Sequence, residues 1–169
     1  METRQDIVIV AHNIRSAHNI GSLFRTADGF GVSKIVLSGY SAIPFREGSL
    51  YKNKSQKEIE KTALGAQDSI LWEYQTTVLS VIKRFRNEGY FLVALEQSPK
   101  SIPFYTKELR KKQRLAIFLG NEVSGVEDNV LQKMDAICEI PMMGKKNSFN
   151  VTVSCGIFLG TLRYFEARS

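Results

Sequence analysis

The sequence has few of the residues that build metal sites and disulfide frameworks, with two cysteines and two histidines among 169 residues. Cys138 and Cys155 lie in apolar segments, so we expect both to be reduced core residues of a cytoplasmic protein. The two histidines lie far from the two cysteines along the chain, and no spacing typical of metal ligands occurs. The sequence therefore predicts no metal.

Long apolar runs and linker-like stretches are also absent. The first ten residues contain acidic side chains and too short an apolar run for a signal peptide. No segment approaches the roughly 18 apolar residues of a membrane span. Only four prolines occur, no internal repeat divides the chain, and 43% of the residues are apolar. We therefore expect a single domain over residues 1–169 that is not bound to a membrane.

The charge balance indicates an anionic partner. Lys and Arg number 23 against 17 Asp and Glu, which gives a net charge of +6 and an isoelectric point of about 9.4. This balance favours a polyanion, and nucleic acid ahead of a membrane surface.

Short apolar runs alternate with amphipathic segments along the chain. The runs typical of buried strands lie at 6–10, 34–39, 71–74, 90–95, 115–120 and 137–142. Helical patterns lie between them at 20–27, 57–70, 78–85 and 127–134. Asn19 is expected to cap the first helix, and Gly29 and Gly31 are expected to end it. The alternation predicts an α/β fold with a mostly parallel sheet and helices on both faces.

The last segment has two possible structures. "NVTVSC" has the propensity of a strand, but apolar residues four apart from Val151 to Leu159 share one helical face. We predict a helix with Ser148 or Asn150 near its N-terminus.

Several common ligand-binding motifs are missing. "GFGVSK" resembles a dinucleotide fingerprint but ends wrongly and follows a helix instead of a strand. Gly144-Lys145 lacks both the first glycine of a P-loop and its Ser or Thr. Neither a G-x-S-x-G elbow nor the glycine-rich loop of Rossmann-type methyltransferases is present.

Three unusual loops follow predicted strands, at the edge of a parallel sheet where ligands bind. They read "HNIRSAHNIGSLFRTADGFG", "FLGNEVSGVED" and "IPMMGKKNSFNVTVSCGI". Each also has an ordinary interpretation: Asn19 and Ser148 could cap helices, Arg25 could be an exposed cation, and Asn121 and Glu122 could be turn residues. Three such loops together in one short chain are harder to explain by these ordinary interpretations.

These loops resemble the signature motifs of the SpoU/TrmH-type RNA 2′-O-methyltransferases of the SPOUT superfamily. The first motif is matched by Asn19, Gly21, Arg25, Thr26 and Ala27, the second by Leu119, Gly120, Asn121, Glu122 and Gly125, and the third by Ile140, Pro141, Met142, Gly144, Ser148, Phe149, Asn150, Val151 and Gly156. Phe149 stands where leucine is usual. The resemblance covers nearly the whole chain.

The resemblance implies a C-terminal trefoil knot, an exception among folds, whose loops bind S-adenosyl-L-methionine. It assigns cofactor contacts to Leu95, Gly120, Ile140, Met142, Ser148 and Phe149. It also implies methyl transfer to a ribose 2′-hydroxyl, which Arg25 would activate and position. An arginine stays protonated in proteins, so the proton acceptor is left open. The residues that would orient Arg25 and the ribose are Asn19, Glu122, Ser148 and Asn150, and Glu122 is the expected partner of Arg25.

RNA contacts are expected from the surplus basic residues. The candidates are Arg25, then Lys145 and Lys146 in the cofactor loop, then Lys52, Lys54 and Lys57, and finally Arg110, Lys111, Lys112 and Arg114. For the last cluster, a solvated charged face is the ordinary alternative.

The resemblance further implies a homodimer that packs through the last helix, where Gly156 and Gly160 would allow a close approach. The first strand starts near Asp6, without a separate RNA-binding domain before it, which favours a compact RNA such as tRNA and leaves rRNA open. A non-catalytic SPOUT-like module and a base methyltransferase are the alternatives. The presence of Arg25 and Asn150 favours catalysis on a ribose.

Overall fold

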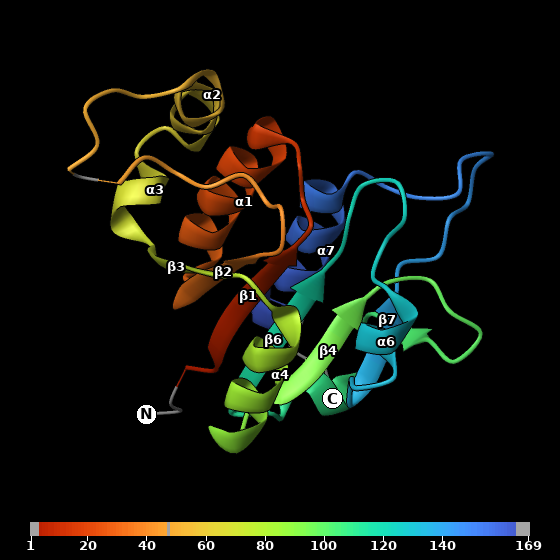
Figure 1. Cartoon of the computed structure of the whole chain (residues 1–169). Helices are drawn as coiled ribbons and strands as arrows, with labels where there is room; N and C mark the ends of the chain where they lie inside the picture. The colour runs from red at the N-terminus through yellow and green to blue at the C-terminus, as the bar shows by residue number, and fades with distance from the viewer. Residues whose placement is uncertain (1–3, 47, 165–169) are drawn as a thin grey trace.

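The computed structural model describes residues 4–46 and 48–164. These residues form one seven-stranded sheet with helices packed against it. The strand order is β3-β2-β1-β6-β4-β7-β5, and every pair of neighbouring strands is parallel (Figure 1). The strands are β1 (Asp6–His12), β2 (Lys34–Ser38), β3 (Leu71–Gln75), β4 (Phe91–Leu95), β5 (Ile102–Pro103), β6 (Arg114–Leu119) and β7 (Ala136–Glu139). The helices are α1 (Ala17–Phe30), α2 (Lys54–Ala63), α3 (Ala66–Ser69), α4 (Val78–Asn87), α5 (Lys107–Arg110), α6 (Asp128–Leu131) and α7 (Val151–Tyr164). Because all strands are parallel, their carboxyl ends meet at one edge of the sheet.

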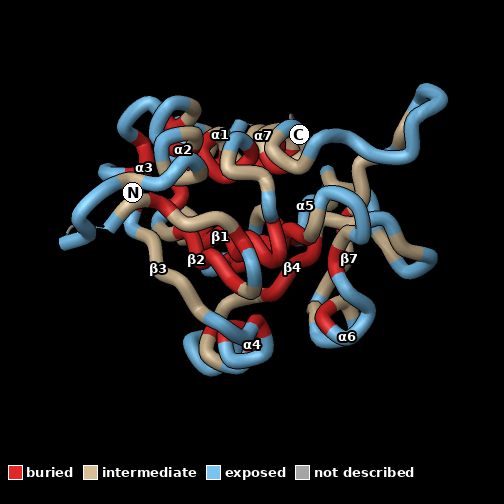
Figure 2. Tube along the Cα trace, turned by 45° about the horizontal axis from the view of Figure 1, so that its top comes forward, coloured by how far each residue is buried: buried red, intermediate tan, exposed pale blue. Residues whose placement is uncertain are grey.

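Successive residues of β1 face two separate apolar cores. Ile7 and Ile9 belong to the core under α1, α2 and α7, whereas Val8 and Val10 belong to the core under α4 and α6. This alternation follows from the two-residue period of a strand. Figure 2 shows α1, α2, α3 and α7 on one side of the buried strands and α4 and α6 on the other. The predicted α/β fold, a parallel sheet with helices on both faces, is confirmed.

The local predictions differ from the structure at a few points. The helix expected over 57–70 is two helices, because Leu64 and Gly65 both have positive φ, at 52° and 92°, and turn the chain. The short elements β5 and α5 were not expected, since two and four residues are too few for a periodic pattern.

The first helix begins earlier than the sequence pattern predicts. Ser16 is the N-cap, and its hydroxyl accepts a hydrogen bond from the backbone N–H of Asn19. Asn19 therefore lies in the first turn of α1, and the prediction that it caps the helix is wrong. Gly31, with φ of 58°, ends the helix, whereas Gly29 lies inside it.

The last segment is a helix, as predicted, and Asn150 lies at its start. The Asn150 Oδ1 atom accepts a hydrogen bond from the backbone N–H of Thr152 at 2.9 Å. This contact satisfies one of the free donors of the first turn. Asn150 thus holds the α7 start in a fixed position.

The two glycines of α7 face α1 of the same chain. A Cβ atom added at Gly156 would lie 3.8 Å from Thr26, and one added at Gly160 would lie 3.7 Å from Phe30. Both distances are ordinary van der Waals contacts within the chain, so the approach of a partner subunit at these glycines stays a prediction.

In residues 4–46 and 48–164, no helix has both the length and the apolar character needed to cross a membrane. The trefoil knot stays a prediction, as does the extension of one domain over residues 1–169.

Candidate active site

A pocket of about 460 Å³ lies at the carboxyl ends of β6, β4 and β7. Its volume is within the range of small-molecule sites. The segments that follow these strands form its walls, together with the starts of α1 and α7. The residues that line it are Asn19, Leu95, Glu96, Gln97, Leu119, Gly120, Asn121, Glu122, Val123, Ser124, Gly125, Cys138, Glu139, Ile140, Ser148, Phe149, Asn150, Val151 and Ser154.

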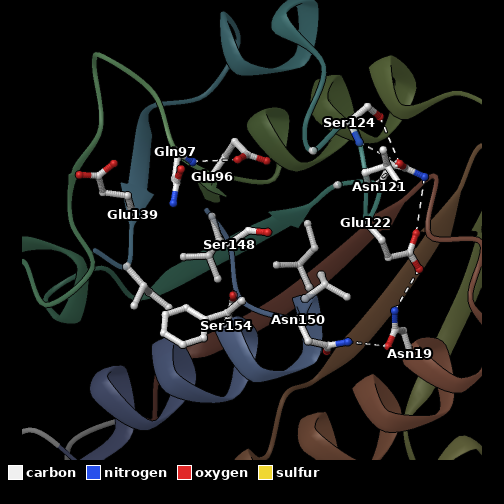
Figure 3. Close-up of a pocket in the computed structure, with 18 of the residues that line it drawn as sticks. Asn19, Glu96, Gln97, Asn121, Glu122, Ser124, Glu139, Ser148, Asn150 and Ser154 are labelled. Atoms are coloured by element: carbon white, nitrogen blue, oxygen red, sulfur yellow. Dashed lines mark hydrogen bonds between the residues drawn. The ribbon is translucent and has the colours of Figure 1, made fainter. Parts of the chain in front are cut away.

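Three residues from three distant segments form a hydrogen-bonded series in this pocket. Asn19 donates from Nδ2 to Glu122 Oε1 at 3.1 Å, and Asn150 donates from Nδ2 to Asn19 Oδ1 at 3.1 Å (Figure 3). The carboxylate can only accept, so it fixes which way the Asn19 amide points, and Asn19 in turn fixes Asn150. The series joins all three sequence motifs.

The Glu122 carboxylate is held in its ionised form. Its partial burial would raise its pKa, but the backbone N–H groups around it and the Asn19 amide donate hydrogen bonds to it. One of these bonds comes from the Ser16 N–H at 3.1 Å. The net result is a pKa below the ordinary value, so the carboxylate is an acceptor that positions other groups. Its pKa is not that of a general base near neutral pH.

A tight turn carries Glu122. Asn121 and Gly125 exchange backbone hydrogen bonds in both directions, at 3.0 and 2.9 Å. The Asn121 side chain also accepts from the N–H groups of Val123 and Ser124. A Cβ atom at Gly120 would lie 2.3 Å from the carbonyl of Gly125, so only glycine fits there. The turn therefore explains why glycines stand on both sides of the Asn-Glu pair.

Glu96 and Gln97, which the sequence analysis did not select, tie the loops of the pocket together. Glu96 accepts hydrogen bonds from the backbone N–H groups of Gln97 and Val126, at 2.8 and 3.0 Å. Gln97 donates from its side chain to the carbonyl of Asn147 at 2.6 Å, which fastens the loop before α7. Polar pairs are common in loops, so residue type alone did not mark Glu96 and Gln97 as site residues. Only their position directly after β4 could have indicated that they lie at the pocket.

Most residues selected for cofactor binding do line the pocket. Those that do are Leu95, Gly120, Ile140, Ser148 and Phe149, and the exception is Met142, which is half-buried outside the lining. The reason is that the segment after Ile140 runs out into solvent before it returns at Ser148. Lys145 and Lys146 lie exposed in this outer part.

Arg25 lies apart from the pocket of its own chain. It is exposed on α1 and makes no hydrogen bond or ion pair with the residues described in the structure. Six residues along a helix correspond to about 9 Å and a rotation of about 240°, so Arg25 and Asn19 point in different directions. The predicted pairing of Glu122 with Arg25 is not formed between the described residues of this chain, where Asn19 and Ser16 donate to that carboxylate.

The cluster of Arg110, Lys111, Lys112 and Arg114 lies at the opposite edge of the sheet. It surrounds the start of β6, whereas the pocket lies beyond the end of that strand. Six residues of strand span about 20 Å. An RNA bound at the pocket would reach this cluster only by extending around the protein.

Among the described residues, no group of three or more His, Cys, Asp or Glu side chains could hold a metal ion. Cys138 and Cys155 are free and buried, and burial raises the pKa of both thiols to about 12. Neither thiol is therefore a reactive nucleophile at neutral pH.

Comparison with known proteins identifies the family. The model of the SpoU rRNA Methylase family matches residues 6–160, which is most of the chain. The chain belongs to the SpoU family. Among relatives of this SpoU protein is the tRNA (guanosine(18)-2'-O)-methyltransferase of Aquifex aeolicus, 29% identical over 160 residues that cover 94% of this chain and 70% of the relative.

Solved structures agree with the fold of the SpoU protein. The rRNA methyltransferase from Sinorhizobium meliloti superimposes with a TM-score of 0.80 at 25% identity, covering 94% of this chain and 55% of that one. The A. aeolicus TrmH/SpoU tRNA modifying enzyme superimposes with a TM-score of 0.77 at 26% identity, covering 96% of this chain and 76% of that one. This chain thus spans only about half of one of these relatives and about three quarters of the other.

Proposed function

We propose that the chain is an S-adenosyl-L-methionine-dependent RNA methyltransferase that modifies a ribose 2′-hydroxyl. The observation that carries the proposal is the series Glu122–Asn19–Asn150, which brings three motifs together in one pocket at the strand ends. The tRNA (guanosine(18)-2'-O)-methyltransferase of A. aeolicus, 70% of which the chain covers, supports it.

The residues of the pocket suit S-adenosyl-L-methionine. Leu95, Ile140 and Phe149 offer apolar surface for the adenine ring. The carboxylates of Glu96 and Glu139 line the same pocket and suit the cationic ammonium and sulfonium groups. We assign cofactor binding to these five residues, to Gly120 and Ser148, and also to Met142, which lies outside the lining on the segment that follows Ile140.

The chain's own groups would hold the acceptor. When bound, S-adenosyl-L-methionine supplies a methyl group on a sulfonium sulfur. Asn150 and Ser148 would orient the ribose, because both line the pocket and Asn150 is fixed by Asn19. Glu122 would hold Asn19 without taking the proton, in keeping with its lowered pKa.

Arg25 lies apart from the pocket of its own chain, so we propose that it activates and positions the hydroxyl and its phosphate from outside that pocket, in the homodimer proposed below. Its guanidinium is exposed and is unpaired among the described residues, so it is available to an RNA ligand. A planar guanidinium can engage two phosphate oxygens at once.

The substrate would be tRNA, with rRNA as the second candidate, since a relative named for each exists. The positive net charge suits either RNA, and Lys145 and Lys146 lie on the loop that borders the pocket. Two free cysteines, both buried, suit the proposed cytoplasmic location.

We also propose that the chain forms a homodimer. Val153 on α7 is 47% exposed, which leaves apolar surface on this helix for a second copy of the chain. Light scattering at micromolar concentration should give twice the mass of one chain. The Val153→Lys substitution should lower the measured mass toward that of one chain. Leu79→Lys, at a site of 42% exposure on α4, is the matched control and should not change the mass. A wild-type mass of one chain would exclude the dimer.

The function itself is tested by transfer of labelled methyl groups from S-adenosyl-L-methionine to bulk tRNA and to rRNA. We expect label in one of them, and ribose mapping in RNA from cells with and without this protein should locate it. Cofactor and RNA binding without any transfer would instead favour a non-catalytic module. Label on a base would favour a base methyltransferase.

A further inference from the structure

An exposed tyrosine stands beside the catalytic pocket and is held at both ends. Tyr40 follows β2, at the carboxyl edge of the sheet, and is 56% exposed. Its backbone N–H donates to Asn13 Oδ1 at 3.2 Å, and its hydroxyl accepts from Asn121 Nδ2 at 3.3 Å. Asn121 lines the pocket and precedes Glu122, so the ring lies next to the Glu122 turn.

The support beneath Tyr40 is built from strained and buried parts. Asn13 is 9% exposed and has a φ of 58°, a conformation that costs free energy in a non-glycine residue. Its side chain also donates to Glu127, and its carbonyl accepts from Asn121 at 2.9 Å. A strained residue persists only where its surroundings determine it, so Asn13 ties Tyr40, Asn121 and α6 into one rigid unit.

Gly39 completes this support. With a φ of 64°, it turns the chain out of β2, and a Cβ atom there would lie 1.9 Å from Asn13 Oδ1. The Tyr74 hydroxyl donates to the Gly39 carbonyl at 2.6 Å. The backbone that carries Tyr40 therefore has little freedom to move.

A rigid, exposed aromatic ring has a typical use in proteins that bind RNA. Unpaired bases stack on such rings, and little entropy is lost when the ring is already fixed. None of the ring pairs or cation–π contacts between described residues involves Tyr40. Its ring is thus not occupied by another side chain of this kind.

We propose that Tyr40 is a stacking residue for an unpaired base of the RNA, at the methylated nucleotide or next to it. The proposal rests on the proposed function. A ribose presented to Asn19 and Asn150 places its own base, or a neighbouring one, within a nucleotide's length of the Glu122 turn. The contact is independent of base identity, since every base has a stacking face.

Three variants test the proposal by steady-state kinetics on bulk tRNA or on rRNA, whichever accepts methyl groups. Tyr40→Leu removes the aromatic face and should lower kcat/KM for RNA about five- to a hundredfold, mostly through KM. Tyr40→Phe keeps the face and should stay within about threefold of wild type. Tyr105→Leu is the control and should have no effect: Tyr105 is 58% exposed but follows β5, and four strands separate β5 from β2 in the sheet.

A second measurement reports stacking directly and does not need turnover. A short single-stranded RNA carrying 2-aminopurine should lose fluorescence on binding to wild type and to Tyr40→Phe, and keep it with Tyr40→Leu. Calorimetry with S-adenosyl-L-methionine should give equal affinities for all variants. Tyr40→Leu with wild-type kcat/KM and wild-type quenching would overturn the stacking role. Absence of methyl transfer by the wild type would instead overturn the proposed function.

Discussion

Asn150 donates a hydrogen bond to Asn19 across 3.1 Å, and this contact joins the last helix to the first turn of α1. The same Asn150 side chain caps α7 through the Thr152 N–H. One residue thus links helix start and pocket, and the two roles can be separated by substitution.

Asn150→Asp should separate the capping of α7 from the hydrogen bond to Asn19. An aspartate still caps α7, but it has no donor to offer Asn19 Oδ1. We expect a melting temperature near that of wild type and methyl transfer reduced about ten- to a hundredfold. Asn150→Ala loses the cap as well and should cost about 1 kcal/mol of stability. Asn147→Ala is the control, since only its backbone carbonyl is used. Full activity of Asn150→Asp would show that the link to Asn19 is unimportant.

Gly120→Ala should distort the turn that carries Glu122. The added Cβ would lie 2.3 Å from backbone atoms of Gly125, which cannot move aside as a side chain can. We expect a loss of about 1–3 kcal/mol in the free energy of unfolding, measured with urea. Gly144→Ala is matched to it, because nothing lies within 4 Å of the added atom. Equal urea midpoints for both variants would contradict the geometry described for the turn.

Glu122→Gln should change how stability depends on pH. The pKa of Glu122 is lowered in the folded protein, so its ionised form stabilises the fold at pH values above the unfolded pKa of about 4.3. That contribution is lost as the pH falls through the folded pKa. Urea midpoints of wild type should therefore fall more steeply below about pH 4.5 than those of the variant. Parallel curves over this window would mean that Glu122 is not held in its ionised form.

Arg25→Ala should remove methyl transfer and leave the fold intact. The side chain is exposed, so its loss should change stability by no more than about 0.5 kcal/mol. The rate should fall on the order of a hundredfold or more, and Arg25→Lys should rescue it poorly, because an ammonium lacks the planar fork. Lys83→Ala, an exposed cation on α4, controls for the loss of charge. Near-normal transfer by Arg25→Ala would take Arg25 out of the mechanism.

The sequence allowed the meeting of the three loops to be predicted, because loops that follow parallel strands share one edge of the sheet. It did not allow the hydrogen-bond partners to be predicted. Serine and asparagine are both common helix N-caps, so the sequence alone did not distinguish Ser16 from Asn19. In the fold, Ser16 caps α1, and the Asn19 side chain donates to the Glu122 carboxylate, which lies at the start of that helix.

Other parts of the site depended on contacts that have no sequence pattern. In the sequence, Glu96 and Gln97 look like ordinary loop residues. Their role is visible only in the fold, where Glu96 accepts from the Val126 N–H and Gln97 donates to the Asn147 carbonyl. The spacing of Gly156 and Gly160 likewise did not show that both lie against α1, near Thr26 and Phe30, which became visible only in the fold.

The most direct test of the central claim compares two RNA acceptors. One is the RNA that ribose mapping identifies as the substrate, and the other is the same RNA with a single 2′-deoxy nucleotide at the methylated position. We predict transfer of labelled methyl groups to the first and none above background to the second, because the acceptor atom is the missing 2′-oxygen. Equal transfer to the deoxy RNA would contradict ribose methylation and the arrangement of Asn19, Glu122 and Asn150 around a ribose.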